Sequence, residues 1–200
     1  MNPVEASASS AEKILLAATD LFAANHFNGV SIKEIAKKSG VNSALISYYF
    51  GGKKNLYQEV LNEQSNLFLN LIARVSSKDI APLAKLREYI TAISEVQKLH
   101  PHRIHLIYRE LLTPTFMCDS FIKNRLYKIH KFMSELVTEA IADGSIRNNM
   151  QPTHVAFTLE SIIVFFFLTH DQIRDLGHFE NGTETVSYTH LRAHETSQDL

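Results

Sequence analysis

The sequence has little of what marks a disulfide-rich, β-rich or strongly basic protein. Its one cysteine, Cys118, cannot form an intramolecular disulfide, which fits a reducing compartment. We interpret Cys118 as a buried apolar residue and not as a redox switch. Seven glycines and five prolines in 200 residues, with no sustained alternation of polar and apolar residues, predict an all-α fold. A net charge of −1 excludes a protein that binds its partners as a bulk polycation.

Long hydrophobic runs are also missing. The longest apolar run, residues 162–168, has seven residues and is well short of the roughly 20 that cross a bilayer. The N-terminal residues show neither the positive region nor the apolar core of a signal peptide, so we expect a cytoplasmic protein without a membrane partner. Two hundred residues are enough for one or two small domains with a sizeable core.

The most informative stretch, Ser31–Phe50, predicts two short helices joined by a tight turn. Ser31 and Glu34 have the spacing of a capping box, in which each side chain accepts a backbone N–H of the other residue. Gly40 is expected to end the first helix, because glycine adopts the left-handed conformation without strain. Asn42 or Ser43 would then cap the second helix.

The spacing of Ala36, Gly40 and Ile46 suits a helix-turn-helix unit. A small residue lets the two helices touch, glycine turns the corner, and an aliphatic residue packs the second helix on the first. In such a unit the second helix enters the major groove of DNA. The alternative is a plain helical hairpin within an all-α core, because short patterns of this kind recur by chance.

A pair of glycines followed by two lysines, residues 51–54, begins a third element. Lysine is unfavourable beside the positive end of a helix dipole, but a phosphate held there would explain its placement. Residues 31–54 contain five lysines and one glutamate, a local net charge of +4. This patch would attract phosphates in a salt-sensitive way, whereas the alternative is a solvated lysine-rich surface.

In these features Ala11–Glu63 resembles the DNA-binding domain of the TetR family of one-component transcriptional regulators. Residues 109–114, Arg-Glu-Leu-Leu-Thr-Pro, and the Gly-Gly-Lys block resemble its CecR-like branch. The family often has tyrosine at the position of Ser47, so contacts there are expected to differ. The segments that carry the family resemblance are 14–22, 27–31, 35–36, 40–41, 48–53 and 56–57.

The resemblance implies that the outward face of the second helix reads base edges while neighbouring residues contact phosphates. Ile46 should face inward. Tyr48 and Tyr49 have the alternative of packing against the first helix. The base-reading candidates are Asn42, Ser43, Ala44, Leu45, Ser47 and Tyr48. The candidates for phosphate contacts and added positive charge are Ser31, Lys33, Lys37, Tyr49 and Lys53.

The remaining chain predicts about five further helices. We divide it into a flexible N-terminus (1–10), a helix-turn-helix domain (11–54) with a connecting helix (53–75), an effector-binding and dimerisation domain (76–182) and an atypical tail (183–200). Within the third of these regions we expect helices over 82–99, 102–112, 118–142 and 153–169, with turns at Gly144, Gly177 and 181–182.

The apolar helix 153–169 is the predicted dimer seam. Phe165, Phe166 and Phe167 point in three directions on a helix, so one intramolecular face can hardly bury all three; the alternative is that they are all core. The resemblance implies that such a dimer reads a palindrome, because two-fold symmetric proteins read symmetric sites.

The resemblance also implies a small-molecule effector pocket in the middle helices, whose occupation moves the DNA-reading heads apart. Stripes of methionine and aromatic residues at helical spacing are also typical of a plain core. Arg109 with Glu110, beside the break at Pro114, has the alternative role of fixing a helix end. The candidate pocket residues are Tyr89, Ile93, His105, Tyr108, Arg109, Met117, Phe121, Arg125, His130, Phe157 and Phe165.

Residues 183–200 differ from the rest, because they are polar, rich in threonine and histidine, and lack an apolar face. The run 186–196 resembles a translated adapter or cloning artefact, and we expect the natural sequence to depart near Glu184.

Two other classes of function stay open beside a regulator. His102 and His105 would share a helix face at a spacing that can ligate zinc, but the sequence supplies no third ligand at a firm spacing and no catalytic motif. A helical adaptor would bind protein and not DNA. Our prediction is a homodimeric repressor, not an enzyme, without metal or cofactor, which binds double-stranded operator DNA and leaves it on binding a small molecule.

Overall fold

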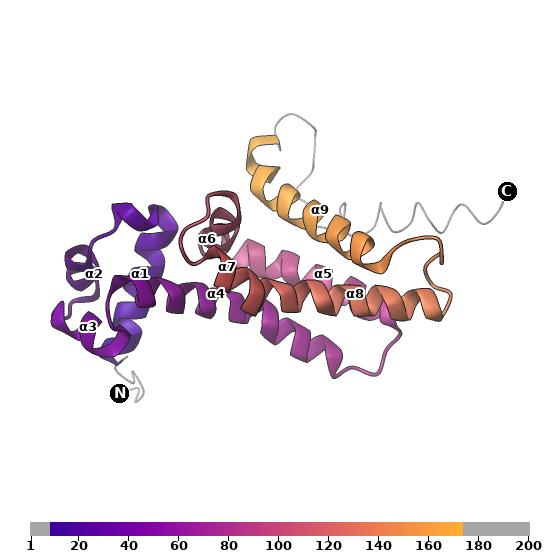
Figure 1. Ribbon diagram of the computed structural model, residues 1–200, viewed down its shortest axis with the longest axis horizontal. Coiled ribbons are helices and arrows are strands. Elements are labelled where there is room, and N and C mark those ends of the chain that lie inside the picture. Colours follow the sequence, from indigo (N-terminus) through magenta and orange to yellow (C-terminus); the bar gives the residue numbers. More distant parts are fainter. Residues whose placement is uncertain (1–8, 174–200) are drawn as a thin grey trace, which may run out of the picture. The chain divides into compact units, whose positions relative to one another are not determined.

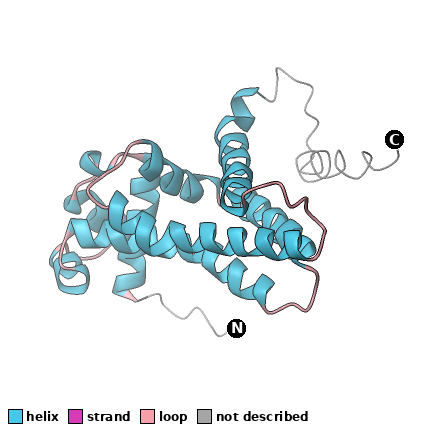
Figure 2. Ribbon diagram, turned by 45° about the vertical axis from the view of Figure 1, so that its right-hand side comes forward, coloured by secondary structure: helices cyan, strands magenta, loops and turns pink. Residues whose placement is uncertain are grey.

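The computed structural model describes residues 9–173, and every regular element in this range is helical (Figure 2). The predicted all-α fold is therefore confirmed. The elements in chain order are α1 (Ser10–Ala24), η1 (Phe27–Gly29), α2 (Ile32–Ser39), α3 (Ala44–Phe50), α4 (Lys53–Ser76), α5 (Pro82–Leu99), α6 (Pro101–Leu112), α7 (Cys118–Phe121), η2 (Ile122–Leu126), α8 (Tyr127–Ala142) and α9 (Pro152–Ile173), as labelled in Figure 1.

The described residues form two compact units. Unit 1 contains residues 9–66 and 100–125, and unit 2 contains 67–99 and 126–173. The chain passes between the units inside α4, between α5 and α6, and where η2 continues into α8. In this division α6 and the residues up to 125 fall in the same unit as the helix-turn-helix, and α6 packs on α1.

Unit 1 is built around α1, which packs against α2, α3 and α6. In Figure 1 the labels of α1, α2 and α3 lie together at the indigo and violet end of the chain. Its core contains fully buried Ile14, Phe22, Ile35, Ile46 and Leu56. Burying such apolar side chains contributes about 1.5–3 kcal/mol each, so the short helices α2 and α3 are held mainly by packing.

The starts and ends of the first helices follow from local chemistry. At α2 the Ser31 hydroxyl accepts the Glu34 N–H at 3.2 Å and the Glu34 carboxylate accepts the Ser31 N–H at 2.7 Å, which confirms the predicted capping box. Ser9 and Glu12 form the same arrangement at α1. Gly40 follows α2 with φ +69° and so ends the helix in the left-handed conformation.

Unit 2 contains the end of α4 together with α5, α8 and α9, and α8 contacts both α5 and α9. The buried ring of Tyr89 on α5 meets Phe132 on α8 at a centroid distance of 5.0 Å. Met133 and Val137, both fully buried, continue this core along α8. Gly144, with φ +84°, follows the end of α8 as predicted.

Two predicted helices differ from the structure. The single helix expected over 118–142 is interrupted by η2, a π-helical turn. The sequence did not predict this turn, because one extra residue in a helical turn leaves almost no trace in the apolar pattern. Arg125 in this turn donates to the Asn62 and Asn66 side-chain oxygens at 3.2 and 2.9 Å. The apolar helix expected over 153–169 is α9, which runs from Pro152 to Ile173. The turn signals after residue 176 and the atypical tail lie outside the described residues.

Candidate nucleic-acid interface

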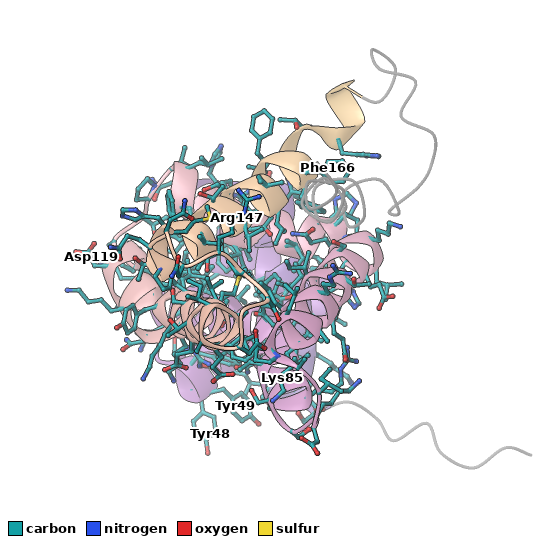
Figure 3. The ribbon with its side chains drawn as sticks, turned by 90° about the vertical axis from the view of Figure 1, so that its right-hand side faces the viewer. Tyr48, Tyr49, Lys85, Asp119, Arg147 and Phe166 are labelled. Carbon is teal, nitrogen blue, oxygen red and sulfur yellow. The ribbon has the colours of Figure 1, made fainter. Side chains whose placement is uncertain are left out.

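The helix α3 presents aromatic and polar side chains to solvent. Ile46 is fully buried against the rest of unit 1, as predicted, whereas Tyr48 is 79% and Tyr49 46% exposed. The two tyrosine rings contact each other edge to face at 5.0 Å and project from the ribbon (Figure 3). With 79% of Tyr48 exposed, the alternative in which Tyr48 packs against the first helix is wrong. A short helix with one buried aliphatic anchor and exposed tyrosines is well suited to enter a groove.

The residues before and along α3 form one polar surface. The Asn42 side-chain oxygen accepts the Ala44 N–H at 2.9 Å, whereas Ser43 makes no side-chain cap, so Asn42 is the residue that caps this turn. Its amide nitrogen stays available to donate to a base edge. Of the six predicted base-reading residues, Leu45 is half-buried and the other five are exposed.

Ser31 and Lys33 at the start of α2 are exposed beside this surface. The hydrogen bonds from Ser31 hold the pKa of the Glu34 carboxyl below its usual value. The Ser31 hydroxyl accepts within the capping box and can still donate its own hydrogen to a phosphate. Lys38 forms a salt bridge with Asp20 at 3.1 Å, which offsets part of the positive charge counted in the sequence.

The start of α4 carries positive charge without an acidic neighbour in its first turn. Gly51 and Gly52 precede it with φ of +71° and +118°, conformations that favour glycine over other residues. The Lys53 ammonium lies 4.2 Å from the centre of the Phe27 ring, and burial lowers the pKa of Lys53. The helix dipole and this cation together favour an anion at the start of α4.

A layer of side chains behind this helix end was not predicted from sequence. Glu110 is only 1% exposed and accepts the Tyr57 hydroxyl at 2.8 Å, although the two residues are 53 positions apart. The Phe27 ring packs against Tyr57 and against Phe116, at 5.0 and 5.1 Å. Residues from η1, α4 and the segment after α6 thus meet directly behind the proposed phosphate contact. The sequence singled out the segments that contain Phe27, Tyr57 and Glu110 but gave no sign that they contact one another.

The predicted effector residues do not form one cluster within either unit. Five of the eleven, Tyr89, Ile93, His130, Phe157 and Phe165, belong to unit 2. The other six, His105, Tyr108, Arg109, Met117, Phe121 and Arg125, belong to unit 1.

Their surroundings also differ. Tyr89 and Ile93 are buried, whereas Phe157 and Phe165 are 65% and 66% exposed. Arg109 hydrogen-bonds to backbone carbonyls, which favours its alternative role of fixing a helix end.

One polar contact lies inside the otherwise apolar packing of α8 on α9. His130 Nδ1 is 3.1 Å from Glu160 Oε2, and burial raises the pKa of Glu160. The other Glu160 oxygen, Oε1, is buried and has no hydrogen-bond partner among the described residues. Such an oxygen can accept a hydrogen bond from a bound molecule.

The described residues contain no group of three His, Cys, Asp or Glu side chains that could hold a metal ion. Glu110, the carboxylate nearest in sequence to the predicted histidine pair, is instead engaged by Tyr57 and Thr115. The structure therefore adds no third ligand to His102 and His105.

The helix α9 exposes much of its apolar surface. Ile162 is exposed in addition to Phe157 and Phe165. Only 11% of the apolar stretch Pro152–His170 is buried inside the described structure. With a mean hydropathy of 1.5 this stretch is long and apolar enough to cross a membrane, a length and hydropathy that mostly buried core helices of soluble proteins also reach. The exposed apolar surface indicates that another surface covers α9.

Comparison with known proteins concerns first the helices α1, α2 and α3, here called the reading head, and then the rest of the chain. Residues 14–60 match the family described as "Bacterial regulatory proteins, tetR family". The HTH-type transcriptional regulator RutR of Escherichia coli K12 is 30% identical over 146 residues, which are 73% of this chain and 68% of RutR.

Two solved structures extend the likeness over most of the chain. The hemolysin II transcriptional regulator HlyIIR is 30% identical, with a TM-score of 0.65 over 84% of this chain and 92% of its own. AibR, solved with isovaleryl coenzyme A and operator DNA, is 25% identical, with a TM-score of 0.69 over 80% and 86% of the two chains. The chain belongs to the TetR family and is a DNA-binding transcriptional regulator.

Proposed function

We propose that this regulator represses transcription by binding a palindromic operator as a homodimer, and that a small molecule releases it. The observation that carries the proposal is the surface of α3, where Tyr48 and Tyr49 are exposed while Ile46 anchors the helix in the core. The two neighbouring tyrosines form an exposed aromatic patch on a seven-residue helix, which is typical of an interaction surface. A helix inserted into a DNA groove uses both as contacts.

In this proposal the exposed face of α3 reads bases in the major groove. Asn42, Ser43 and Ser47 are donors and acceptors for base edges, Ala44 and Leu45 are apolar partners for thymine methyl groups, and Tyr48 can serve either purpose. Tyr49, Ser31 and the lysines around Lys33 and Lys53 contact phosphates, which fixes the register of the helix but carries no sequence information.

The second subunit would cover α9. Its exposed phenylalanines, Phe157 and Phe165, form an apolar surface that suits an apolar partner surface. Two-fold pairing of identical chains places this same surface on both sides of the interface. Pairing converts the second half-site contact into an intramolecular event and so raises affinity without any new contact.

The effector is proposed to bind in unit 2. AibR, solved with isovaleryl coenzyme A and operator DNA, is a precedent for a protein of this fold that binds both kinds of partner. Glu160 Oε1, buried without a partner between α8 and α9, is a candidate to accept a hydrogen bond from the effector. An effector acts on DNA binding only if it binds one conformation of the dimer better than the other.

The test is selection of bound duplexes from a random DNA pool, with the mass of the protein in solution measured by light scattering. We expect enrichment of an inverted repeat and the mass of a dimer. A dimer that enriches no sequence at any salt concentration would favour the adaptor alternative and contradict the proposal. Heat of stoichiometric zinc binding in a calorimetric titration, lost on His102→Ala, would instead favour the enzyme alternative.

A further inference from the structure

Three polar side chains of unit 1, here called the donor cluster, have no role in the proposed DNA contacts. Arg125 in the π-helical turn η2 donates from Nε to the Asn62 side-chain oxygen at 3.2 Å and from Nη1 to the Asn66 side-chain oxygen at 2.9 Å. All three residues are half-buried. Asn62 and Asn66 are one turn apart on α4 and so lie on the same face of that helix. The donor cluster therefore joins η2 to α4.

The guanidinium of Arg125 has only neutral partners. Among the residues that the structure describes, no carboxylate forms an ion pair with it. Arg109, which is also half-buried, instead donates to carbonyls at the C-terminal end of α1, where the helix dipole supplies negative charge. Partial burial of a cation is costly when no negative group offsets its lost hydration. An anion bound beside Arg125 would offset this cost.

The hydrogen bonds of the donor cluster use its acceptors and leave its donors. Arginine can only donate, so each asparagine must turn its side-chain oxygen toward Arg125. The Nδ2 atoms of Asn62 and Asn66 and the Nη2 atom of Arg125 have no hydrogen-bond partner within the described part of the chain. These nitrogens are not buried, so a ligand can reach them. The site therefore offers a positive charge and N–H groups.

These groups match the chemistry of an anion. Nη2 of Arg125 and the second N–H of Nη1 lie on one edge of the guanidinium, which can donate in parallel to two oxygens of a carboxylate or phosphate. The amide nitrogens of Asn62 and Asn66 are further donors for the same kind of group. Lys123, exposed in the same turn, adds a second positive charge. A neutral ligand would use the N–H groups but would leave the charge uncompensated.

The position of the donor cluster in the fold also favours a binding site. Arg125 lies in η2, and π-helical turns are rare and occur frequently at functional sites. Asparagine is an unfavourable residue for the middle of a helix, yet α4 contains two of them facing this turn. A purely structural contact between α4 and η2 could be made by apolar residues without these costs.

We propose that Arg125, Asn62 and Asn66 bind the carboxylate or phosphate group of a small molecule. This site belongs to unit 1, whereas Glu160 belongs to unit 2 and has the opposite chemistry, because its free oxygen can only accept a hydrogen bond from a donor. The inference does not rest on the proposed function, since anion binding is measured without DNA. The alternative is that the donor cluster only fastens η2 to α4 and binds no anion.

The test titrates the full-length protein with butyrate, inorganic phosphate or butyramide while NMR records the side-chain N–H signals of Arg125, Asn62 and Asn66. Butyrate and butyramide share a carbon chain and differ in charge at neutral pH. We expect the signals to shift and saturate with butyrate, with phosphate or with both, and not with butyramide. Saturation with only one anion shows which class of anion the site takes. Signals that saturate with neither anion, or that respond alike to butyrate and butyramide, would overturn the inference.

Two variants test which atoms carry the binding. Arg125→Gln should weaken anion binding roughly ten- to hundred-fold, because it removes the charge-assisted hydrogen bonds. Lys123→Ala is the matched control, because it removes an exposed positive charge from the same turn, and it should change the affinity by about two-fold at most. Asn66→Asp places a carboxylate beside the guanidinium, so Arg125 is paired within the chain and anion binding should be lost.

The signals of Asn62 report binding in every variant, and thermal unfolding is recorded alongside. If Arg125→Gln fails to fold, Asn66→Asp carries the test, because it keeps the arginine and replaces one neutral partner with a charged one. A folded Arg125→Gln or Asn66→Asp protein that binds the anion as tightly as wild type would contradict the proposed site.

Discussion

The helices α3 and α9 each expose two aromatic side chains, and the chemistry around these side chains differs. On α3 the exposed rings are Tyr48 and Tyr49, which carry hydroxyl groups and lie in a segment rich in lysine. On α9 the exposed rings are Phe157 and Phe165, in a stretch with a mean hydropathy of 1.5. Neighbouring exposed aromatic side chains are typical of interaction surfaces. The polar groups beside the rings separate a surface for nucleic acid from a surface for an apolar partner.

The helices α1, α2 and α3 also differ from α9 in the interactions that stabilise them. The helices α1 and α2 begin with complete capping boxes and α3 ends at a left-handed glycine, so the reading head is fixed by local chemistry as well as by packing. The apolar surface of α9 is exposed, and we infer that another subunit covers it. The predictions that follow test this contrast, from the largest expected effect to the smallest.

Phe165→Lys places a charge on the proposed dimer surface and should convert the dimer to a monomer. Loss of the second half-site contact is expected to weaken operator binding by roughly 100-fold or more. Light scattering and fluorescence anisotropy with labelled operator measure the two effects. Tyr127→Lys, at an exposed aromatic residue of α8, is the control and should stay dimeric. A Phe165→Lys protein that remains a dimer would place the seam elsewhere.

Tyr48→Ala should change which bases the protein prefers. Removing one base contact typically costs about 1–3 kcal/mol of discrimination, so the enriched motif should relax at one position in each half-site. Selection from a random pool, run in parallel for both proteins, measures this change. Ser145→Ala, an exposed substitution in unit 2, should give the wild-type motif. The same motif from Tyr48→Ala would argue against α3 as the reading helix.

Lys53→Ala should weaken binding to all sequences alike. Removal of one phosphate contact is expected to reduce the slope of log affinity against log salt by about one. Titrations of operator and of unrelated DNA over a range of salt give the slope. Lys128→Ala removes an exposed charge from α8 and should leave the slope unchanged. If Lys53→Ala leaves the slope unchanged, the Lys53 ammonium packs on Phe27 without contacting a phosphate.

Ser31→Ala removes one half of the α2 capping box and should destabilise the fold by about 1 kcal/mol at neutral pH. The side-chain hydrogen bond from Ser31, which alanine removes, is the largest cause of the lowered pKa of Glu34, so its stabilisation is present above the unfolded pKa of that carboxyl. It is lost as pH falls through the lower folded pKa. Denaturant unfolding at neutral and acid pH should therefore show a difference between the two proteins that shrinks in acid. A difference in unfolding free energy between the two proteins that grows in acid would contradict the role given to the Ser31–Glu34 capping box.

The sequence predicted features that depend on neighbours in the chain. Ser31 with Glu34, Gly40 after α2, and the start of α5 at Pro82 each follow from chemistry within a few residues. The outward face of α3 followed from the position of Ile46. These signals were sufficient for the reading head and for most helix ends.

The features that the sequence did not predict depend on contacts between distant segments. The hydrogen bond from Tyr57 to Glu110 joins residues 53 positions apart, and no pattern in either segment refers to the other. The π-turn of η2 is a local insertion that leaves the amphipathic pattern nearly intact. The division into two units followed from the packing of α6 on α1, which the length and polarity of α6 do not reveal.

The most direct test replaces Tyr48 and, separately, Phe165 with a photo-crosslinking phenylalanine derivative in the operator-bound protein. The account predicts that the probe at position 48 attaches to a base in the major groove of each half-site, whereas the probe at position 165 attaches to a second copy of the chain. A probe at position 48 that attaches only to protein, or one at 165 that attaches to DNA, would contradict the assignment of the two surfaces.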